Sequence, residues 1–473
     1  MLRVEPALRF FMKIAYFLLL FPLFVVTGGA YGGEAISIHK ANFYLFEKEG
    51  KPFFPIGANA GFLMNLRLTD KEAERDIAEW SGNGINVLRI AIDSALNSGA
   101  LLSEVETSDG ELTSAVLSRL DFLIHAAEKR GMAVILILFD LQSMSENWEH
   151  HPYNRSQGGW RANLSDFFLL QKSRSQAIRR TKQLTARYKN RPILAWEIAR
   201  GADAWNSEAK PDKETIYSAQ VWFERIAKEI ETNDPGRLKS ISFMPNTLPT
   251  ALQPELMGLV SLADFFLLHI RSKDAYVAAQ SASQYIQMAR DCKKPVFIGE
   301  STWTGRENEY EEFIRNIFWS AAASCSGSFL TPIEGRDGFR IPDSSRALCA
   351  TLLDFLSYVE LGGRPRPPSK SPIQAEPKDA CLLVESMAGN DRIFWLLRKK
   401  PGLGQVQLTF HTIEGIYEYQ WFDTESRGKG RNKEFQLRRQ QLILQSPEFM
   451  RDCLGILRFK KSFEIKKEPN QPK

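Results

Sequence analysis

Charged and polar residues stand at the ends of several short apolar runs in this sequence. Glu300 follows Pro-Val-Phe-Ile-Gly, Asp140 follows Val-Ile-Leu-Ile-Leu-Phe, and His269 follows Phe-Phe-Leu-Leu. A carboxylate can act as a nucleophile or a proton donor, and neighbouring Arg or His side chains set its protonation state. If these runs are strands of one parallel barrel, the residues that close them meet at its C-terminal end.

The elements that would position these residues alternate between strand and helix. Eight apolar runs predict strands at residues 53–57, 86–92, 133–139, 193–199, 240–244, 265–269, 296–299 and 327–330. Amphipathic stretches predict helices at residues 70–80, 112–129, 173–188, 217–231, 275–290, 309–323 and 344–358. No Gly-rich phosphate loop follows the first strand, so we expect an α/β chain folded as a (β/α)₈ TIM barrel rather than a doubly wound sheet.

The 473 residues exceed what one barrel needs, and the pattern changes after the last helix. We expect the barrel at residues 34–361, a Pro-rich linker at 362–378 and a small all-β sandwich domain at 379–465, with short strands from Ala380 onward and a disordered tail at 466–473. The aromatic segment at 417–423 resembles strands of the small β domains that often follow such barrels, and we expect it in the core.

The N-terminus has the order of an export signal. Basic residues at 3, 9 and 13 precede an apolar run at 14–26 and a small-residue stretch at 27–33. The run is shorter than the ~20 residues of a membrane-spanning helix, and Pro22 interrupts it. We therefore expect residues 1–33 to be a signal peptide and the protein to be secreted, periplasmic or at the cell envelope, with an uncleaved anchor as the alternative.

The number of cysteines and the net charge of the chain limit which cofactors and partners we expect. The five cysteines are widely spaced and odd in number, which predicts neither a metal site nor a disulfide scaffold, although Cys381 and Cys453 remain a candidate pair. Glu149-His150-His151 is too compact for a metal site, and we expect no metal, no cofactor and no nucleic acid. The net charge of +5 arises after about residue 377, which indicates a solvated basic face or affinity for an anionic glycan or envelope surface.

Four motifs resemble glycoside hydrolase family five, a clan A family with cellulase-like and mannanase-like members. They are the segments 50–59, 86–90, 192–198 and 294–300, which fall in that family's order at its first, second, fourth and seventh strands. The loop after the third strand, with Pro152-Tyr153-Asn154, also resembles these relatives. The resemblance implies a polysaccharide or oligosaccharide ligand and two carboxylates about 5 to 5.5 Å apart in a retaining mechanism.

The resemblance assigns roles residue by residue. Glu300 matches the nucleophile, Arg89 the arginine that hydrogen-bonds it, and His269 the strand-six histidine, while Asn59 ends the first motif. Where the family has Trp-Glu-Leu-x-Asn-Glu, this chain has Arg200 in place of the Asn and Gly201 in place of the acid/base Glu. The proton donor is therefore missing from its usual position.

Other carboxylates are candidates for that role. Glu197 precedes position 201 by four residues, so on a strand that rises about 3.3 Å per residue it lies about 13 Å deeper in the barrel than that position. This depth favours a buried structural carboxylate. Asp203 is two residues beyond the vacant position on a loop that can fold back, and Glu334 and Asp140 are further candidates. The alternative is that Glu300 forms an ion network with Arg89 and Arg200 that fills the pocket.

The aromatic platforms are also altered. Leu330-Thr331-Pro332 offers no Trp at the eighth strand, and Arg271 replaces an aromatic residue. Trp148, Trp160 and Trp205 are candidates for sugar stacking or for packing of the loops. Two hypotheses follow: a retaining glycosidase with Glu300 as nucleophile and an unconventional acid such as Asp203, or an inactive homologue that binds glycan or protein through the same cleft.

Overall fold

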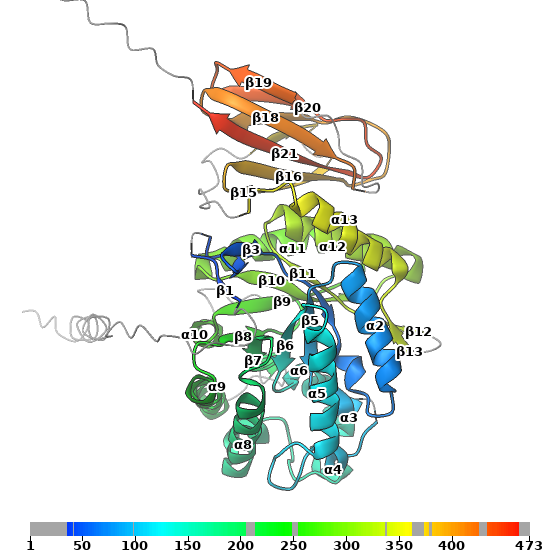
Figure 1. Cartoon of the computed structure of the whole chain (residues 1–473), viewed down its shortest axis with the longest axis vertical. Helices are drawn as coiled ribbons and strands as arrows, with labels where there is room; N and C mark the ends of the chain where they lie inside the picture. Colours follow the sequence, from blue (N-terminus) through cyan, green and yellow to red (C-terminus); the bar gives the residue numbers. More distant parts are fainter. Residues whose placement is uncertain are drawn as a thin grey trace, which may run out of the picture.

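The computed structural model describes residues 36–40, 42–97, 99–204, 213–247, 254–335, 338–361, 373–377, 381–424 and 433–462. A barrel forms the larger part of the molecule, and the β-sheets of the C-terminal segment lie against its helical side, at one end of the long axis of the molecule (Figure 1). The expected signal peptide, most of the expected linker and the tail are outside the described residues. No helix among the described residues has the length and apolar character required to cross a membrane.

Eight parallel strands close into the predicted barrel, which confirms the (β/α)₈ fold. Their order around the barrel is β10-β11-β4-β5-β6-β7-β8-β9. The strands are β4 (Ile56–Asn59), β5 (Val87–Ala91), β6 (Ala133–Ile137), β7 (Ile193–Glu197), β8 (Leu238–Ser242), β9 (Phe265–Ser272), β10 (Val296–Trp303) and β11 (Ser328–Leu330). Each overlaps one of the eight apolar runs.

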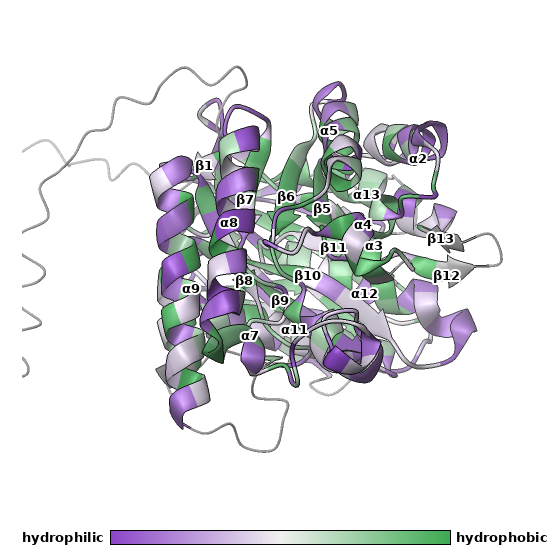
Figure 2. Cartoon of the chain, turned by 90° about the horizontal axis from the view of Figure 1, so that it is seen from below, coloured by the Kyte–Doolittle hydropathy of each residue, from purple (hydrophilic) through white to green (hydrophobic). Residues whose placement is uncertain are grey.

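Long helices surround the strands, with polar outer surfaces and apolar inner ones (Figure 2). They are α2 (Asp70–Gly82), α5 (Ser114–Glu128), α8 (Gln171–Tyr188), α9 (Lys213–Asn233), α10 (Pro254–Leu262), α11 (Ala275–Ala289), α12 (Tyr310–Ala323) and α13 (Asp343–Leu356). Local sequence fixes their starts. At α2, for example, Thr69 accepts from the Glu72 amide, and the Glu72 carboxylate accepts from the Thr69 amide.

Short elements occupy the loops at the C-terminal ends of the strands. They are the 3-10 helices η1 (Gly61–Met64), η2 (Trp148–His150), η3 (Arg155–Gln157) and η6 (Glu307–Glu309), the helices α3 (Ser94–Asn97), α4 (Leu102–Val105), α6 (Leu141–Glu146) and α7 (Asp166–Leu169), and the hairpin β12 (Ile333–Gly335) with β13 (Gly338–Arg340). A further 3-10 turn, η5 (Arg290–Cys292), follows α11. Sequence periodicity did not predict these elements, which surround the site.

A small antiparallel sheet closes the opposite end of the barrel. It contains β1 (Ser37–Ile38), β2 (Phe46–Lys48) and β3 (Lys51–Phe53). The Phe46 ring, 1% exposed, lies 5.0 Å from the rings of both Phe265 and Phe297 and completes the apolar cluster at this end. The barrel interior is therefore a packed apolar core at this end, and the charged residues lie toward the C-terminal ends of the strands.

The C-terminal segment forms the predicted small all-β domain. A three-stranded sheet orders β14 (Gln374–Glu376), β17 (Gln407–His411) and β20 (Gln441–Gln445). A five-stranded sheet orders β15 (Cys381–Ala388), β16 (Asp391–Arg398), β21 (Asp452–Lys461), β18 (Gly415–Phe422) and β19 (Lys433–Leu437). Strand β14 lies within the segment that we expected to be linker, so the β domain begins before residue 379.

This β domain packs directly on helices α12 and α13. The Arg315 guanidinium on α12 lies 2.7 Å from Asp452 of β21, and the Phe355 ring on α13 lies 5.1 Å from Phe422 of β18. Buried residues of β15, β16 and β21 belong to the same apolar cluster as the barrel helices. All five cysteines carry free thiols, so Cys381 and Cys453 do not form the candidate disulfide.

Candidate functional site

A cavity of about 270 Å³ lies at the C-terminal ends of the barrel strands. Charged side chains cover its floor, and small or apolar residues form its walls. Its lining residues are Asn59, Gly61, Phe62, Arg89, Ala91, Ser94, Ile137, Asp140, Ser143, Arg200, Glu300, Thr331 and Pro332. Four residues predicted from sequence as catalytic or substrate-binding, namely Glu300, Arg200, Arg89 and Asn59, therefore meet in one cavity.

Glu300 points into this cavity because of an irregularity in β10. The pairing of β10 with β9 shifts between Ile298 and Glu300, which leaves Gly299 without a partner and pairs Glu300 with His269. A Cβ atom at position 299 would lie 2.6 Å from the Leu267 Cβ, so only glycine fits there. Glu300 is 8% exposed and reaches the cavity floor.

Arg200 joins the two carboxylates of the cavity. Its Nε and Nη2 groups donate to Oε2 and Oε1 of Glu300, both at 2.8 Å, and its Nη1 donates to Oδ1 and Oδ2 of Asp140 at 2.8 and 3.0 Å. Nη1 also donates to Ser143 Oγ at 3.1 Å. Such two-pronged contacts are the strong form of an Arg–carboxylate pair. Both oxygens of Glu300 are thus occupied by a guanidinium.

The protonation states follow from this arrangement. Burial alone would raise the pKa of Glu300, but Arg200, then His269 and Arg89, outweigh it and hold that pKa far below its ordinary value. Burial would lower the pKa of Arg200, but Asp140 and Glu300 raise it. Burial, together with the nearby arginines, lowers the pKa of His269 well below its ordinary value despite Glu300. The cluster therefore contains an anionic Glu300, a cationic Arg200 and a neutral His269 at neutral pH.

Arg89 and Glu197 form a second ion pair below the first. Arg89 Nε and Nη2 donate to Glu197 at 2.7 and 2.6 Å, and Ser242 Oγ donates to the same carboxylate at 2.7 Å. The nearest Arg89–Glu300 approach is 3.9 Å, too long for a hydrogen bond. Arg89 therefore pairs chiefly with Glu197, and its effect on Glu300 is electrostatic.

Asn59 and His269 contact other residues of the same chain through polar groups. Asn59 Oδ1 accepts from Arg89 Nη1 at 2.8 Å, and its Nδ2 donates to the carbonyls of Gly299 and Leu330 at 2.9 and 3.2 Å. His269 Nδ1 lies 3.1 Å from Gln142 Oε1. Because the neutral ring can donate through Nδ1, this contact favours the Nδ1–H tautomer. In this structure both residues position charged groups of the site.

The end of β7 has a backbone that leaves no space for a side chain at position 201. Gly201 has φ +69°, and a Cβ atom there would lie 2.7 Å from Gln142 Cβ and 3.0 Å from Gln142 Cα. Gln142, in α6, also donates from its amide to the Arg200 carbonyl at 3.0 Å. Helix α6 therefore occupies the space beside position 201, a feature that the sequence pattern did not reveal.

Asp203 lies away from Glu300 in the described structure. Its Oδ1 accepts from the Met244 amide at 2.6 Å, it is 5% exposed, and it does not line the cavity. Burial raises the pKa of its carboxyl, and the bonds from Met244 and Thr247 lower it. The side chain of Glu334, the other distal candidate, is outside the described residues. Asp140 does line the cavity, but it is bound to Arg200.

The tryptophans after the third strand pack within their loop. The Trp148 ring stacks on His151 at 6.1 Å, and its Nε1 donates to the Ala162 carbonyl at 3.3 Å. Trp160 lies under the Arg161 guanidinium and the Lys172 ammonium, each 4.5 Å from the ring centroid. Neither lines the cavity. Trp205, the third candidate platform, is outside the described residues.

A buried network that we did not predict supports the site from behind. Asp93 Oδ2 accepts from the Asp140 amide at 2.9 Å, and Asp93 Oδ1 accepts from Arg180 at 2.7 Å. Glu106 lies 3.6 Å from Arg180 and accepts from the Tyr153 hydroxyl at 2.6 Å. The available signal was Arg180, a charged residue on the inward face of α8. This network fixes the backbone that carries Asp140.

Among the described residues, no group of three or more His, Cys, Asp or Glu side chains is arranged to hold a metal ion. The ionisable side chains that line the cavity are the carboxylates of Glu300 and Asp140 and the guanidinium groups of Arg89 and Arg200.

Comparison with known proteins finds a family model that matches part of the barrel. Residues 46–230 match the family described as Cellulase (glycosyl hydrolase family 5). The chain is 22% identical over 307 residues to mannan endo-1,4-beta-mannosidase 5 of Solanum lycopersicum, covering 58% of this chain and 73% of that protein. It is 26% identical over 223 residues to mannan endo-1,4-beta-mannosidase 1 of Oryza sativa subsp. japonica, covering 44% and 49%.

Solved structures support the same architecture over most of the chain. A protein described as a glycoside hydrolase has a TM-score of 0.58 at 15% identity and covers 90% of this chain and 97% of its own. A glycoside hydrolase family 5 protein from Bacteroides vulgatus has a TM-score of 0.56 at 12% identity, covering 90% and 93%. At these identities the likeness concerns the fold, including the region of the β domain.

Proposed function

Because the barrel of this chain carries a glycosyl hydrolase family 5 domain, we propose that it binds a polysaccharide in the Glu300 cavity without cleaving it. The ligand class we propose is a β-linked mannan, since the curated relatives are mannan endo-1,4-beta-mannosidases. The alternative, a retaining glycosidase with Glu300 as nucleophile, is an outcome of the test below.

The observation that carries the proposal is the two-pronged contact of Arg200 with Glu300. A retaining nucleophile must bring a carboxylate oxygen to the anomeric carbon. Here both oxygens are bound to a guanidinium, and the lowered pKa makes the carboxylate a weaker nucleophile. A cation beside the reacting carbon also opposes an oxocarbenium-like transition state.

Among the described residues that line the cavity, neither carboxylate is available as a proton donor, which supports the same conclusion. Asp140 and Glu300 are the two carboxylates among the cavity's lining residues, and Arg200 binds both. Asp203 is hydrogen-bonded to the Met244 amide instead of facing the cavity. Loss of general acid catalysis alone removes about 10²- to 10⁴-fold in rate.

The cavity retains features of a sugar-binding site. Its 270 Å³ lies near the lower end of the usual ligand-pocket range, about 300 to 1,000 Å³, which suits a short segment of a sugar chain. Phe62 and Pro332 supply apolar surface for the CH groups of a sugar ring, and the Ser143 and Thr331 hydroxyls supply polar contacts. Sugar recognition therefore does not require Glu300 to react.

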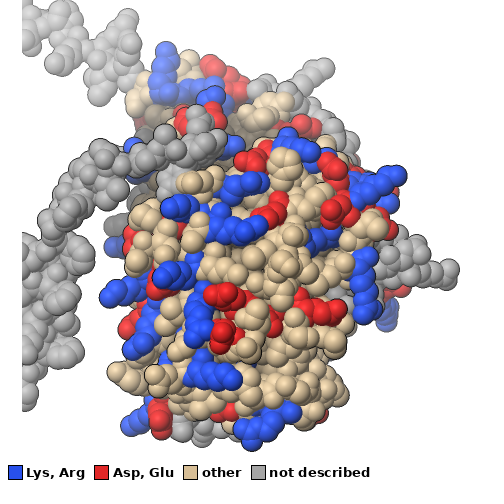
Figure 3. Space-filling model, turned by 60° about the horizontal axis from the view of Figure 1, so that its bottom comes forward, with Lys and Arg blue, Asp and Glu red and all other residues tan. Residues whose placement is uncertain are grey.

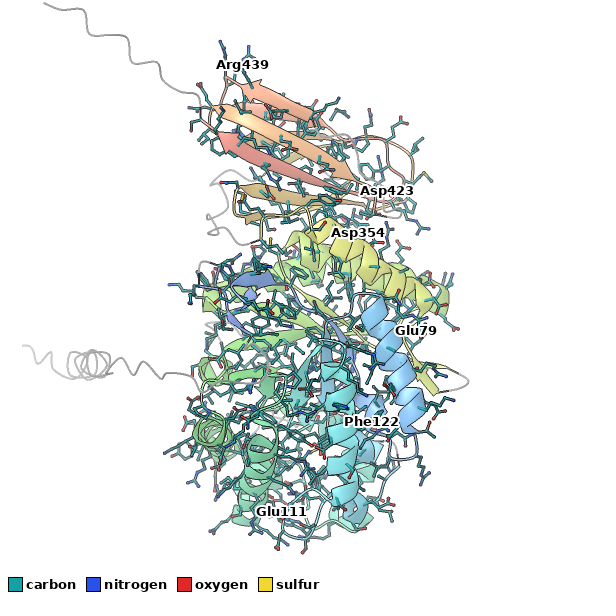
Figure 4. The ribbon with its side chains drawn as sticks, in the orientation of Figure 1. Glu79, Glu111, Phe122, Asp354, Asp423 and Arg439 are labelled. Carbon is teal, nitrogen blue, oxygen red and sulfur yellow. The ribbon has the colours of Figure 1, made fainter. Side chains whose placement is uncertain are left out.

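Two measurements on the full chain test the proposal. We expect manno-oligosaccharides to bind by calorimetry, and Phe62→Ala to weaken that binding about tenfold through loss of apolar contact. Phe122→Ala is the matched control: Phe122 is partly buried on α5, outside the cavity lining, and should leave affinity unchanged (Figure 4). Absence of binding across manno-, gluco- and galacto-oligosaccharides would exclude a glycan-binding role.

Activated aryl glycosides separate binding from catalysis because their leaving groups need little acid assistance. We expect no hydrolysis and no covalent labelling of Glu300 by 2-fluoro glycosyl fluorides, measured by mass spectrometry of the peptide. Labelling at Glu300 that disappears in Glu300→Gln would instead establish a functional nucleophile and support the glycosidase hypothesis.

The proposal includes export, which rests on the order of residues in the N-terminal segment. We expect the mature N-terminus of the expressed protein to begin near residue 34. Mass spectrometry of the intact protein, recovered from the secreted or periplasmic fraction, measures it. A mature chain that retains residues 14–26 in a membrane fraction would favour an anchor.

A further inference from the structure

Helix α8 and the turn after it have an unusual charge composition. Residues 171–191 contain eight Lys and Arg and no Asp or Glu, whereas the whole chain has 61 Lys and Arg against 56 Asp and Glu. The barrel fold does not require this excess of positive charge, and none of these residues lines the Glu300 cavity. The segment therefore calls for a separate explanation.

Three of the eight cations serve the fold. Arg180 is buried and pairs with Asp93, while Arg187 and Arg191 pair with Asp121 and Glu128 of the neighbouring helix α5. These arginines lie on the side of α8 that faces the barrel or α5.

Four of the other five form a line on the outer face, which we call the α8 basic stripe: Lys172, Arg179, Lys182 and Lys189. The fifth, Arg174, is partly buried and lies outside this line. All four are exposed. Their spacings of seven, three and seven residues keep them within an arc of about 100° and extend them over about 25 Å of helix. Arg179 lies 3.3 Å from Asp109, and Lys172 lies over the Trp160 ring. The stripe thus starts beside the loop that follows the third strand.

We propose that the α8 basic stripe binds a linear anionic polysaccharide, of the uronic-acid class, lying along the helix. A single row of cations matches a chain whose carboxylates repeat along one axis, and such attraction is electrostatic and sensitive to salt. Trp160, covered by two cations, adds a ring at one end of the row. This site is distinct from the Glu300 cavity and does not depend on the function proposed there.

The surroundings of the stripe favour a narrow polymer over a membrane surface. Carboxylates flank it: the Asp109 and Asp121 side chains are 74% and 43% exposed, and Glu224 and Glu231 are exposed on α9. Basic and acidic side chains lie next to each other at this end of the molecule rather than forming a broad surface of one sign (Figure 3). A plane of anionic headgroups would meet all of these carboxylates, whereas a chain along the stripe would meet only Asp109, which lies beside Arg179.

The test measures binding of oligogalacturonate to the full chain at low and moderate salt. Replacing three lysines of the stripe (Lys172→Glu, Lys182→Glu, Lys189→Glu) should weaken binding about tenfold or more and flatten its dependence on salt. All three positions are exposed, so the fold should be kept, and circular dichroism checks this. The matched control reverses Lys399, Lys400 and Arg439, exposed cations of the β domain, and should leave binding unchanged.

Each outcome has a definite meaning. Equal losses in the stripe and control variants would show attraction to net charge and would overturn the proposal, as would no binding of oligogalacturonate at low salt. Binding to phosphatidylglycerol vesicles, but not to oligogalacturonate, would assign the stripe to a membrane surface instead. Manno-oligosaccharide affinity should be the same in all three proteins, so failure of one site is distinguishable from failure of the other.

Discussion

The Arg200 guanidinium lies between the carboxylates of Glu300 and Asp140 and determines the arrangement of charges in the cavity. A guanidinium between two carboxylates needs both of them for its own stability, because a buried charge without a partner is costly. Arg200 is 15% exposed and Glu300 10% exposed at the side chain, so solvent screens the pair only partly. The cluster is therefore more than a surface ion pair, and its removal should affect stability as well as chemistry.

Arg200→Gln should lower the free energy of unfolding by about 3–5 kcal/mol, because it leaves Glu300 and Asp140 buried together without their cation. The pKa of Glu300 should rise at the same time, since Arg200 is the strongest of the groups that lower it. Urea unfolding at neutral pH measures the first effect.

The matched control is Arg187→Gln, whose ion pair with Asp121 is 44% and 43% exposed and should contribute no more than about 1 kcal/mol. Equal losses in the two variants would mean that the Arg200 cluster is energetically an ordinary surface pair.

The burial of His269 makes the stability of the folded protein depend on pH, and it also determines the direction of that dependence. Its pKa is lower in the folded protein than the ordinary value of about 6.5, so the unfolded chain takes up a proton first as pH falls. Stability should be unaffected by this group above pH 6.5 and should decrease below it, by at most about 1.4 kcal/mol per pH unit.

Comparison with His269→Gln isolates this effect, since other buried groups, such as His151 with its lowered pKa and Asp203 with its raised pKa, titrate in both proteins. Unfolding free energies between pH 6.5 and 5.0 should fall more steeply in the parent, by about 2 kcal/mol over that interval. Parallel curves would show that His269 is already charged or exposed.

At the scale of elements, we expect α6 to prevent the backbone at position 201 from accommodating a carboxylate side chain. Gly201→Glu requires a left-handed conformation of a side-chain residue, costing about 1–2 kcal/mol, and places its Cβ against the backbone of Gln142. The added overlap should cost about 1–3 kcal/mol more. We expect lower stability and no gain of activity on aryl mannosides.

The variant Gly236→Glu separates the conformational cost of a left-handed backbone from the cost of overlap with neighbouring atoms. Gly236 has φ +77° with no atom within 4 Å of an added Cβ, so only the conformational cost applies. Thermal unfolding of the two variants measures the difference. A Gly201→Glu variant as stable as Gly236→Glu, or one with new hydrolytic activity, would show that α6 yields to a side chain at this position.

The elements also show which parts of the structure the sequence could predict. All eight barrel strands and seven long helices follow from the alternation of apolar runs and amphipathic stretches, because the barrel strands are buried on both faces and each helix buries one face. The short elements do not, since α6 and η1 have few residues and their positions depend on tertiary contacts. In strand β20, burial alternates over Gln441–Gln445 although the sequence does not alternate in polarity, because the apolar Ile443 is exposed.

The sequence could predict which residues line the candidate site, but not which of them form hydrogen bonds and ion pairs with one another. Glu300, Arg200, Arg89 and Asn59 line one cavity because they lie in or just after the C-terminal halves of barrel strands. Which carboxylate pairs with which arginine depends on side-chain length and depth, so Arg89 pairs with Glu197 rather than Glu300. Asp203 turns toward Met244 because the loop after β7 packs against the end of β8, which residue spacing does not show.

For the whole molecule, the decisive feature is that one apolar cluster spans the barrel helices and the five-stranded sheet. Trp395 and Leu454 of that sheet are fully buried within it, and Trp395 Nε1 donates to Asp452, which also contacts Arg315 of α12. Arg458 of β21 donates to the Tyr358 carbonyl at 2.6 Å and pairs with Asp391. The β domain is therefore part of the barrel's folding unit rather than an independent module.

This predicts one cooperative thermal transition for both parts, with equal calorimetric and van't Hoff enthalpies. Phe422→Ala removes ring contacts with Phe355 and Tyr358 across the junction, should cost about 3–5 kcal/mol, and should speed hydrogen exchange in α12 and α13 as well as in the sheet. Phe435→Ala, on the edge strand β19, removes contacts with Tyr417 and Tyr419 inside the β domain and should leave exchange in α12 and α13 unchanged. Two separate transitions in the parent protein would mean that the barrel and the β domain fold independently despite their shared apolar cluster.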